Sequence, residues 1–134
     1  MRDSLYGISY ISDIDFIGDG TGVAISAAST VWTKNCRFEG WKTALLGFGN
    51  MWVNATDCTF ENNGIGLHWN STDVTATDSH YTGNIFRWND TAVLLEQVPT
   101  DTVLNFGQCV FEHNETDLDN RCSQPVDLSE AEFR

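Results

Sequence analysis

Residues 57–67 read DCTFENNGIGL, and this stretch decides the fold because its pattern recurs along the chain. A cysteine and a phenylalanine stand two residues apart and are followed by Asn62-Asn63-Gly64, then by the apolar Ile65 and Leu67. Short alternating runs on either side of Asn and Gly are typical of a strand, a turn and a second strand.

The phenylalanine of this stretch returns at a nearly constant spacing. It stands at Phe16, Phe38, Phe60, Phe86 and Phe111, with successive spacings of 22, 22, 26 and 25 residues. Two residues before it stand Ile14, Cys36, Cys58, Asn84 and Cys109, and three after it stand Asp19, Trp41, Asn63, Asn89 and Asn114. Six and seven after it stand Gly22-Val23, Ala44-Leu45, Gly66-Leu67, Ala92-Val93 and Asp117-Leu118. A repeat of this length indicates a solenoid of stacked coils.

Two solenoids have such a period. In a leucine-rich repeat, Cys58, Phe60 and Asn63 would fill the strand motif, but the rest of each repeat would need leucines in a helical or turn-like return. Here the return, residues 64–78, reads GIGLHWNSTDVTATD, and its Thr, Val and Gly favour strand over helix. The pattern C-x-F-x-x-N-x-x-[GA]-[VL], over roughly residues 10–118, resembles the pectin-lyase-like superfamily.

That resemblance implies an all-β fold, a right-handed parallel β-helix. We therefore predict a solenoid of about five coils with a period of 22–26 residues over residues 10–118. Residues 1–9 form an N-terminal lead-in, and residues 119–134 form an irregular C-terminal tail. Coils stack at the normal strand spacing of about 4.8 Å.

The alternation of side chains along a strand predicts which residues face the core. Cys58 and Phe60 point inward, as do Leu67 and Trp69 after the turn, whereas His68 points outward. Cys36, Cys58 and Cys109 then form a column of buried thiols, with disulfides as the alternative, and Cys122 lies outside the repeat. Asn and Gly at the corner suit a left-handed backbone, and stacked Asn amides can bond one another from coil to coil.

Charge and composition restrict the partners. Nineteen acidic residues against seven Lys plus Arg give a net charge of −12, which disfavours nucleic acid and anionic membranes. No apolar run is long enough for insertion into a membrane, and no signal peptide is visible. Because neither end of the solenoid has a recognisable cap, we expect a segment of a larger secreted or cell-surface protein, whose other coils or domains are its partners.

One outward surface is acidic. This acidic face consists of Asp13, Asp15, Arg37, Glu39, Asp57 and Glu61. Acid–base cleavage of a glycan needs paired carboxylates, so Glu39, Glu61, Asp57 and Arg37 are the catalytic candidates. Calcium needs several converging oxygens, and Asp13, Asp15 and Asp57 are the candidate ligands. The alternative is that these charges form an ordinary solvated surface.

Two tryptophans are candidates for binding a polysaccharide. Trp41 and Trp88 fall in the turn after the phenylalanine, where flat rings could stack on sugar faces; the alternative is that they cap the core. Ala24, Leu46, His68 and Leu94 form a second outward column that offers no carboxylate, and His68 alone is expected to be ordinary surface. Four sequons, at Asn54, Asn70, Asn89 and Asn114, do not by themselves indicate glycosylation.

Enzymes of the superfamily carry local signatures. The hydrolases share Asn-Thr-Asp, Asp-Asp, Gly-His-Gly and Arg-Ile-Lys, and none of these occurs here. The resemblance thus implies the fold rather than the activity. We expect a non-catalytic structural or glycan-binding β-helix; the alternative is a polysaccharide lyase or glycoside hydrolase that uses the acidic face.

Overall fold

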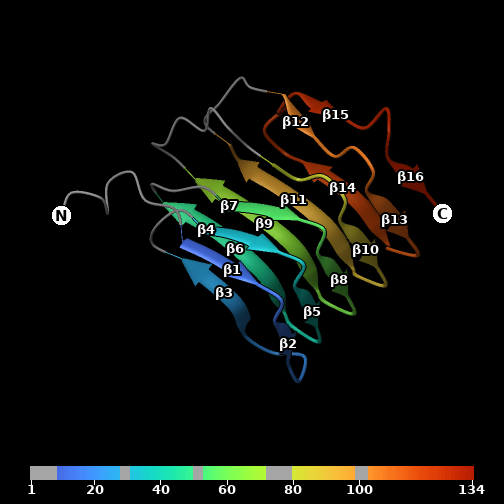
Figure 1. Ribbon diagram of the computed structural model, residues 1–134. Coiled ribbons are helices and arrows are strands. Elements are labelled where there is room, and N and C mark those ends of the chain that lie inside the picture. The colour runs from blue at the N-terminus through green and yellow to red at the C-terminus, as the bar shows by residue number, and fades with distance from the viewer. Residues whose placement is uncertain (1–8, 28–30, 50–52, 72–79, 99–102) are drawn as a thin grey trace.

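The structure, a computed structural model, describes residues 9–27, 31–49, 53–71, 80–98 and 103–134. Its regular elements in these ranges are all β-strands, and every strand pair is parallel. The chain winds into a parallel β-solenoid of about five turns, as the sequence predicts (Figure 1). Within the described ranges, no helix of a length and hydropathy suited to crossing a membrane is present.

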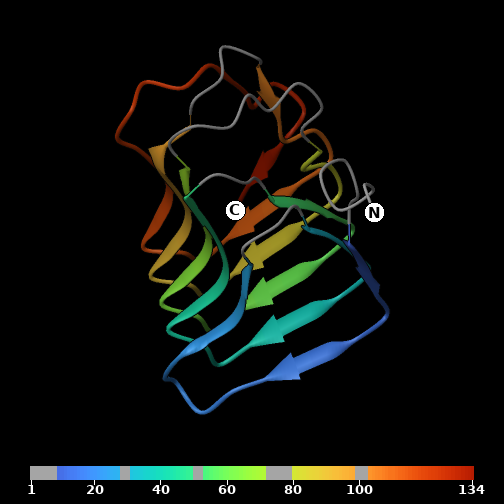
Figure 2. The ribbon, with the colours of Figure 1, turned by 90° about the vertical axis from the view of Figure 1, so that its left-hand side faces the viewer.

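The strands of successive coils stack into three main sheets, seen as successive rungs in Figure 2, and two more strands pair separately. The first sheet contains β1 (Ser9–Ser12), β4 (Val31–Lys34) and β7 (Val53–Thr56). The second sheet contains β2 (Asp15–Ile17), β5 (Arg37–Glu39), β8 (Thr59–Glu61), β10 (Ile85–Arg87), β13 (Val110–Glu112) and β16 (Glu132–Phe133). The third sheet contains β3 (Val23–Ala27), β6 (Thr43–Gly49), β9 (Ile65–Ser71), β11 (Thr91–Gln97) and β14 (Thr116–Asn120).

The side of the first sheet continues beyond β7. Ala55 N–H donates to His80 O and Asp57 N–H to Thr82 O, so residues 80–82 run beside β7. Two further strands, β12 (Leu104–Asn105) and β15 (Val126–Asp127), pair with each other farther along. The tail, residues 119–134, was expected to be irregular but holds β15 and β16, which add a partial sixth coil.

The phenylalanines form a continuous column inside the second sheet. The register pairs Phe16 with Phe38, Phe38 with Phe60, Phe60 with Phe86, and Phe86 with Phe111. Ring centroids of neighbours lie 4.9–5.0 Å apart with planes within 10° of parallel, and Phe133 extends the column beyond Phe111. Face-to-face contact at the coil spacing follows because in-register strands place identical side chains above one another.

The first coil departs from the predicted alignment. Val23 pairs with Thr43 and Ile25 with Leu45, so the counterpart of Ala44 is Ala24 rather than Gly22. The second outward column accordingly begins at Ser26, opposite Leu46, and not at Ala24. The physical reason is a longer turn, in which the Asp19 carboxylate accepts hydrogen bonds from the N–H and hydroxyl of Thr21.

The asparagines after the phenylalanine form a buried ladder. Asn63 Nδ2 donates to Asn89 Oδ1, and Asn89 Nδ2 donates to Asn114 Oδ1, each at 3.0–3.1 Å. Each amide also donates to a phenylalanine carbonyl in the coil before it, as Asn89 does to Phe60 O. Asn63 and Asn89 are 3% and 2% exposed. Coil-to-coil amide bonding is thus confirmed, and it satisfies donors that would otherwise be buried without partners.

The corner contains a left-handed backbone, as predicted, and Gly and Asn occupy it in two of the coils. Positive φ values occur at a column that we call the left-handed column: Gly40 (81°), Asn62 (57°), Trp88 (59°) and His113 (55°). A second set occurs in the turn between the first and second sheets, at Asp13, Asn35, Asp57, Gly83 and Gln108. Gly and Asn adopt this conformation readily, whereas a bulky residue such as tryptophan does so at a cost.

The cysteine column is buried and reduced. Cys36, Cys58 and Cys109 are at most 3% exposed and all four cysteines are free, Cys122 being exposed. Burial raises the pKa of Cys58 to about 11 and that of Cys109 to about 12. Asn84 fills the same column in the fourth coil and is satisfied by the carbonyls of Ala55 and Tyr81.

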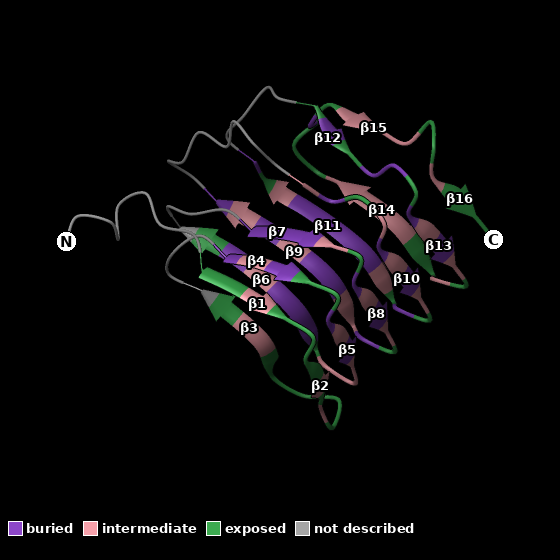
Figure 3. Ribbon diagram, in the orientation of Figure 1, coloured by how far each residue is buried: buried purple, intermediate pink, exposed green. Residues whose placement is uncertain are grey.

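Burial is concentrated in the middle coils (Figure 3). Phe38, Phe60 and Phe86 are fully buried, and Trp69 points inward, as predicted. Exposure rises at the first coil, where Ile14 is 44% exposed although it belongs to the cysteine column. Two sequon asparagines, Asn54 and Asn89, lie in the buried interior at 1% and 2% exposure.

Candidate functional site

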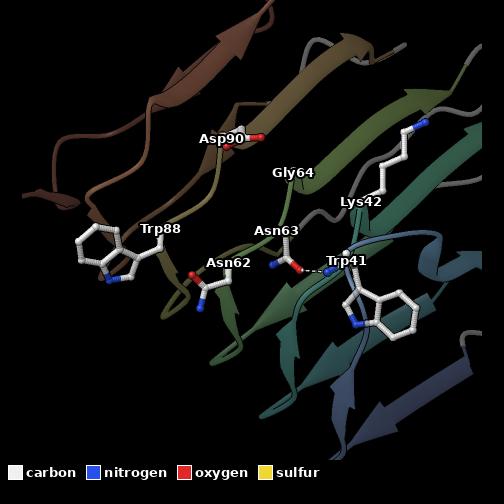
Figure 4. Close-up of a pocket in the computed structure, with 8 residues that line it drawn as sticks. Trp41, Lys42, Asn62, Asn63, Gly64, Trp88 and Asp90 are labelled. Atoms are coloured by element: carbon white, nitrogen blue, oxygen red, sulfur yellow. Dashed lines mark hydrogen bonds between the residues drawn. The ribbon is translucent and has the colours of Figure 1, made fainter.

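The corner between the second and third sheets carries a hollow of about 440 Å³ (Figure 4). We call it the corner hollow, and its lining consists of Gly20, Trp41, Lys42, Asn62, Asn63, Gly64, Trp88 and Asp90. Both tryptophans predicted to bind a glycan therefore line one cavity. Figure 4 shows their rings at opposite ends, with Asn62 and Asn63 between them. The volume falls within the usual range of small-ligand sites, about 300–1,000 Å³.

Trp41 forms the end of the hollow nearest the first coil. Its main-chain N–H donates to Asn63 Oδ1, and its indole Nε1–H donates to Phe16 O at 3.0 Å. A Cβ on Gly18 would lie 2.8 Å from the indole, so the ring packs closely on the first coil. Trp41 is half-buried, packs against the core and lines the hollow.

Trp88 forms the opposite end and is 56% exposed. Its ring stacks on His113 of the next coil, with centroids 4.5 Å apart and 20° between the planes. Both residues belong to the left-handed column, where the preceding coils carry Gly40 and Asn62. An exposed ring in a conformation that costs on the order of 1 kcal/mol contributes little to folding, and strain of this kind is typical of functional sites.

Three polar side chains of the lining are available to a ligand. Lys42, Asn62 and Asp90 make no side-chain hydrogen bond or ion pair with another residue in the described ranges. They are solvent-exposed, and Lys42 and Asp90 bring one positive and one negative charge to the hollow. Asn63, by contrast, is fully engaged in the amide ladder. The hollow thus joins aromatic rings to donors and acceptors that could bond hydroxyl groups.

The acidic face is an ion-pair network on the second sheet. Arg37 pairs with Glu39 and, at 3.0 Å, with Glu61. Arg87 lies 3.7 Å from the same Glu61 carboxylate, so two cations flank it. The hydrogen bond to Glu61 raises the pKa of Arg37. Glu39 and Glu61 lie in adjacent coils, as predicted, but Arg37, which pairs with both, offsets their mutual repulsion.

The candidate calcium ligands are not all brought together. Asp13 and Asp57 lie in the turn before the second sheet with Asn35 between them, and Asn35 Nδ2 donates to Asp13 Oδ1 at 2.7 Å. Two coils separate the carboxylates by about 10 Å, beyond what one calcium ion spans with ligands at about 2.5 Å. Asp15 instead lies opposite Arg37. In the described part of the chain, no group of three or more His, Cys, Asp or Glu could hold a metal ion.

The second outward column does have a carboxylate beside His68, which the sequence analysis missed. His68 Nε2 lies 2.8 Å from Glu96 Oε1. The register between β11 and β9 shifts between Leu95 and Gln97, and this bulge directs Glu96 toward the preceding coil. Alternation already places Glu96 on the outward face, two residues after Leu94, so the sequence carried a signal for this pair. Leu94, at 5% exposure, is more buried than an outward position suggests.

A second aromatic surface, also missed, lies on the first sheet. Trp32 stacks on His80 at 4.4 Å and 10°, and the Lys34 ammonium lies 4.5 Å from the Trp32 ring centroid. Tyr10 packs beside Trp32 at 5.8 Å. The loops of different length between coils obscured the alignment of these residues. Unlike Trp88, the Trp32 ring is already paired with a cation.

Comparison of the chain with protein-family models, with curated proteins and with solved structures finds no match. The description of the corner hollow and of the acidic face therefore rests on the structure of this chain alone.

Proposed function

We propose that this chain is a non-catalytic, glycan-binding β-helix, a segment of a larger secreted or cell-surface protein, and that it binds polysaccharide at the corner hollow. The observation that carries the proposal is the placement of Trp41 and Trp88 at the two ends of one cavity whose remaining side chains are polar. Aromatic rings that pack on the apolar face of a sugar, with amide and charged groups that bond its hydroxyls, are what a carbohydrate site requires.

Trp88 supports binding more strongly than folding. It is exposed, and its backbone is left-handed at a position where Asn62 and Gly40 serve the preceding coils without strain. Asn or Gly would serve stability better at this position. The Trp88 ring instead stacks on His113 and borders the corner hollow.

A neutral polysaccharide fits the electrostatics best. The net charge of −12 repels polyanions such as uronic-acid polymers, and Lys42 is the single cation among the lining residues, where Asp90 offsets it. Hydroxyl groups can accept from Lys42 and donate to Asp90, so both charges suit a neutral sugar.

The same proposal includes the kinship and context of the chain. The Phe, Cys and Asn columns support membership of the pectin-lyase-like superfamily of right-handed parallel β-helices. Ile14, Ile17 and Val23 are exposed at the first coil, where β1, β2 and β3 form the edges of the sheets. Apolar edge surface of this kind supports contact with another coil or domain of the same longer chain.

The alternative function, polysaccharide cleavage at the acidic face, would use Glu39 and Glu61. Their separation by one coil suits a carboxylate pair, but both are engaged by Arg37. A catalytic carboxyl group must be free to contact the substrate, whereas both of these carboxylates are held in salt bridges. The arrangement therefore favours the binding proposal over the enzymatic one.

The test is a panel of neutral and uronic-acid polysaccharides, assayed for binding by affinity electrophoresis and for new chain ends with and without calcium. We expect retention by a neutral polysaccharide, loss of retention in Trp88→Asn, and no cleavage. Trp32→Ala, which removes another His-stacked tryptophan on the first sheet, is the matched control and should be retained. Binding that survives Trp88→Asn, or cleavage that Glu61→Gln abolishes, would overturn the proposal.

A further inference from the structure

The corner hollow is longer along the solenoid axis than around the coil. Its lining comes from four successive coils, with Gly20 in the first, Trp41 in the second, residues 62–64 in the third and Trp88 in the fourth. Three coil steps of about 4.8 Å span about 14 Å, whereas the lining of one coil covers at most three consecutive positions, or about 7 Å. The two tryptophans accordingly lie at opposite ends of the long dimension (Figure 4).

Little projects from the floor of the hollow. Gly20 and Gly64 have no side chain, and a Cβ on Gly64 would lie 2.6 Å from Lys42 O, so glycine is required there. Asn63 turns inward to the amide ladder. Asn62 is the short side chain that lies between the two rings. Because the hollow is open to solvent, a chain molecule can lie along it without threading into the protein.

The positions along the hollow recur once per coil. Lys42, Gly64 and Asp90 each precede the strand of the third sheet in their coil, and the register of β6, β9 and β11 aligns them. Asn62 and Trp88 are likewise neighbours in the left-handed column. In an extended polysaccharide, each sugar advances the chain by nearly the length of one coil step, about 4.8 Å. Successive sugars of such a chain meet successive coils, whereas a coiling chain advances less per sugar and leaves the line of the hollow.

Resting on the proposed function, we propose that the corner hollow binds an extended, ribbon-like neutral glycan along the solenoid axis, with one sugar on each coil. Three coil steps accommodate about three sugars. The outer sugars contact Trp41 and Trp88, while Asn62 and Asp90 bond hydroxyl groups of the sugars on the third and fourth coils. Cellulose-, mannan- and xylan-type chains have this extended form, whereas amylose coils. The conformation of the chain, rather than one sugar ring, thus sets the class of ligand.

Oligosaccharides from the disaccharide to the hexasaccharide test length and conformation together. The probes are cello-, manno- and xylo-oligosaccharides, malto-oligosaccharides of the same lengths are the coiling control, and calorimetry gives each Kd. We expect an extended series to bind, with a Kd that falls by about tenfold from the disaccharide to the tetrasaccharide and is then constant. A Kd that does not depend on length, or binding in the polysaccharide panel that no extended series reproduces, would overturn the axial proposal. No binding to any polysaccharide of the panel would instead refute the proposed function itself.

The direction of the glycan is tested with a nitroxide on the reducing end of the tetrasaccharide, which broadens nearby amide signals in NMR spectra. An axial chain places the nitroxide at one end of the hollow, so we expect the strongest broadening at Gly20 in the first coil or at His113 in the fifth. A chain that crosses the corner would instead broaden Glu61 on β8 or His68 on β9 most strongly. That pattern would overturn the axial direction.

Asn62→Gly removes the contact in the third coil and keeps a residue suited to the left-handed backbone. We expect it to weaken tetrasaccharide binding by about threefold. Asn35→Gly is the matched control, because Asn35 has nearly the same φ, 51° against 57°, but lies outside the lining of the hollow. The control should leave the Kd unchanged. Equal Kd values for the two variants would mean that the chain does not pass over the third coil, contrary to the proposal.

Discussion

Trp88 and His113 stack face to face, with centroids 4.5 Å apart, from adjacent coils and from backbones that are both left-handed. The pair lies outside the core, and the Trp88 ring borders the corner hollow. A solenoid of this kind separates stability from recognition, because inward columns carry the packing while corner residues can vary from coil to coil. That separation leads to testable consequences.

Trp88→Asn should leave stability nearly unchanged. Asn accepts the left-handed backbone more easily than tryptophan does, and this gain offsets the lost stacking on His113, worth about 0.5–1.5 kcal/mol. We expect a free energy of unfolding within about 1 kcal/mol of the parent, measured by chemical denaturation. A loss as large as that of a core variant would mean that Trp88 serves the fold.

Phe60→Ala should destabilise strongly. Phe60 is fully buried and stacked between Phe38 and Phe86, so its removal opens a cavity in the middle of the column. The expected cost is about 3–5 kcal/mol, the usual range for an interior aromatic residue. Phe133→Ala, at the 50% exposed end of the same column, is the control and should cost clearly less. Similar denaturation midpoints for the two variants would contradict this ladder.

The buried thiols should make the protein sensitive to alkali. Burial raises the pKa of Cys58 from 9.0 to about 11, so the folded state retains a proton that the unfolded state loses. The contribution of Cys58 to stability is therefore complete below pH 9 and declines as the pH rises toward 11, by up to about 1.4 kcal/mol per pH unit.

The slope of the unfolding free energy against pH measures this effect. Between pH 9 and 11, Cys58→Ala should have a shallower decline than the parent, whatever its absolute stability. At pH 8 the thiols of Cys36, Cys58 and Cys109 should resist labelling until the protein unfolds, while exposed Cys122 reacts at once. Identical slopes in the two proteins would show that the Cys58 thiol titrates normally.

Calcium should stabilise the protein no more than sodium chloride at matched ionic strength. Arg37 and Arg87 engage Glu39 and Glu61, and Asp13 and Asp57 lie two coils apart, so the oxygens do not converge on one ion. Both salts then act by screening alone. The measurement is the Tm at millimolar calcium against the sodium control. An excess shift with calcium, lost in Asp13→Asn or Asp57→Asn, would establish a site on the acidic face.

The inward columns were predictable from the sequence, whereas the surface was predictable only in part. A fixed period places Phe60 over Phe38 and Asn89 over Asn63 whatever the loops do, because the ladder of backbone hydrogen bonds sets the register. The sequence also placed Trp41 and Trp88 in the turn that follows the phenylalanine. The directions of their rings could not be predicted, since they depend on one left-handed residue per coil.

The failures have local causes. A longer turn at Asp19 and Thr21 displaced the first coil by two residues relative to the alignment. The register shifts after Leu95, beside Glu96, which pairs with His68 although the predicted outward column ended at Leu94. The sequence places Arg87 in the same outward column as Glu61, but whether the two side chains meet depends on their conformations on the neighbouring strands. Such irregularities are invisible to a periodic reading of the chain.

The buried amides have a bearing on where the chain can be made. Asn89 is followed by Asp90-Thr91, a motif that N-linked glycosylation enzymes accept, yet its Nδ2 donates to Phe60 O and Asn114 Oδ1 inside the protein. Asn54, in the motif Asn54-Ala55-Thr56, is equally enclosed. An oligosaccharide on either nitrogen has no space in the interior, so attachment during synthesis would prevent the coils from closing. Production in a host that modifies such motifs would therefore require both threonines or asparagines to be replaced, whereas a host without that pathway can make the native chain directly.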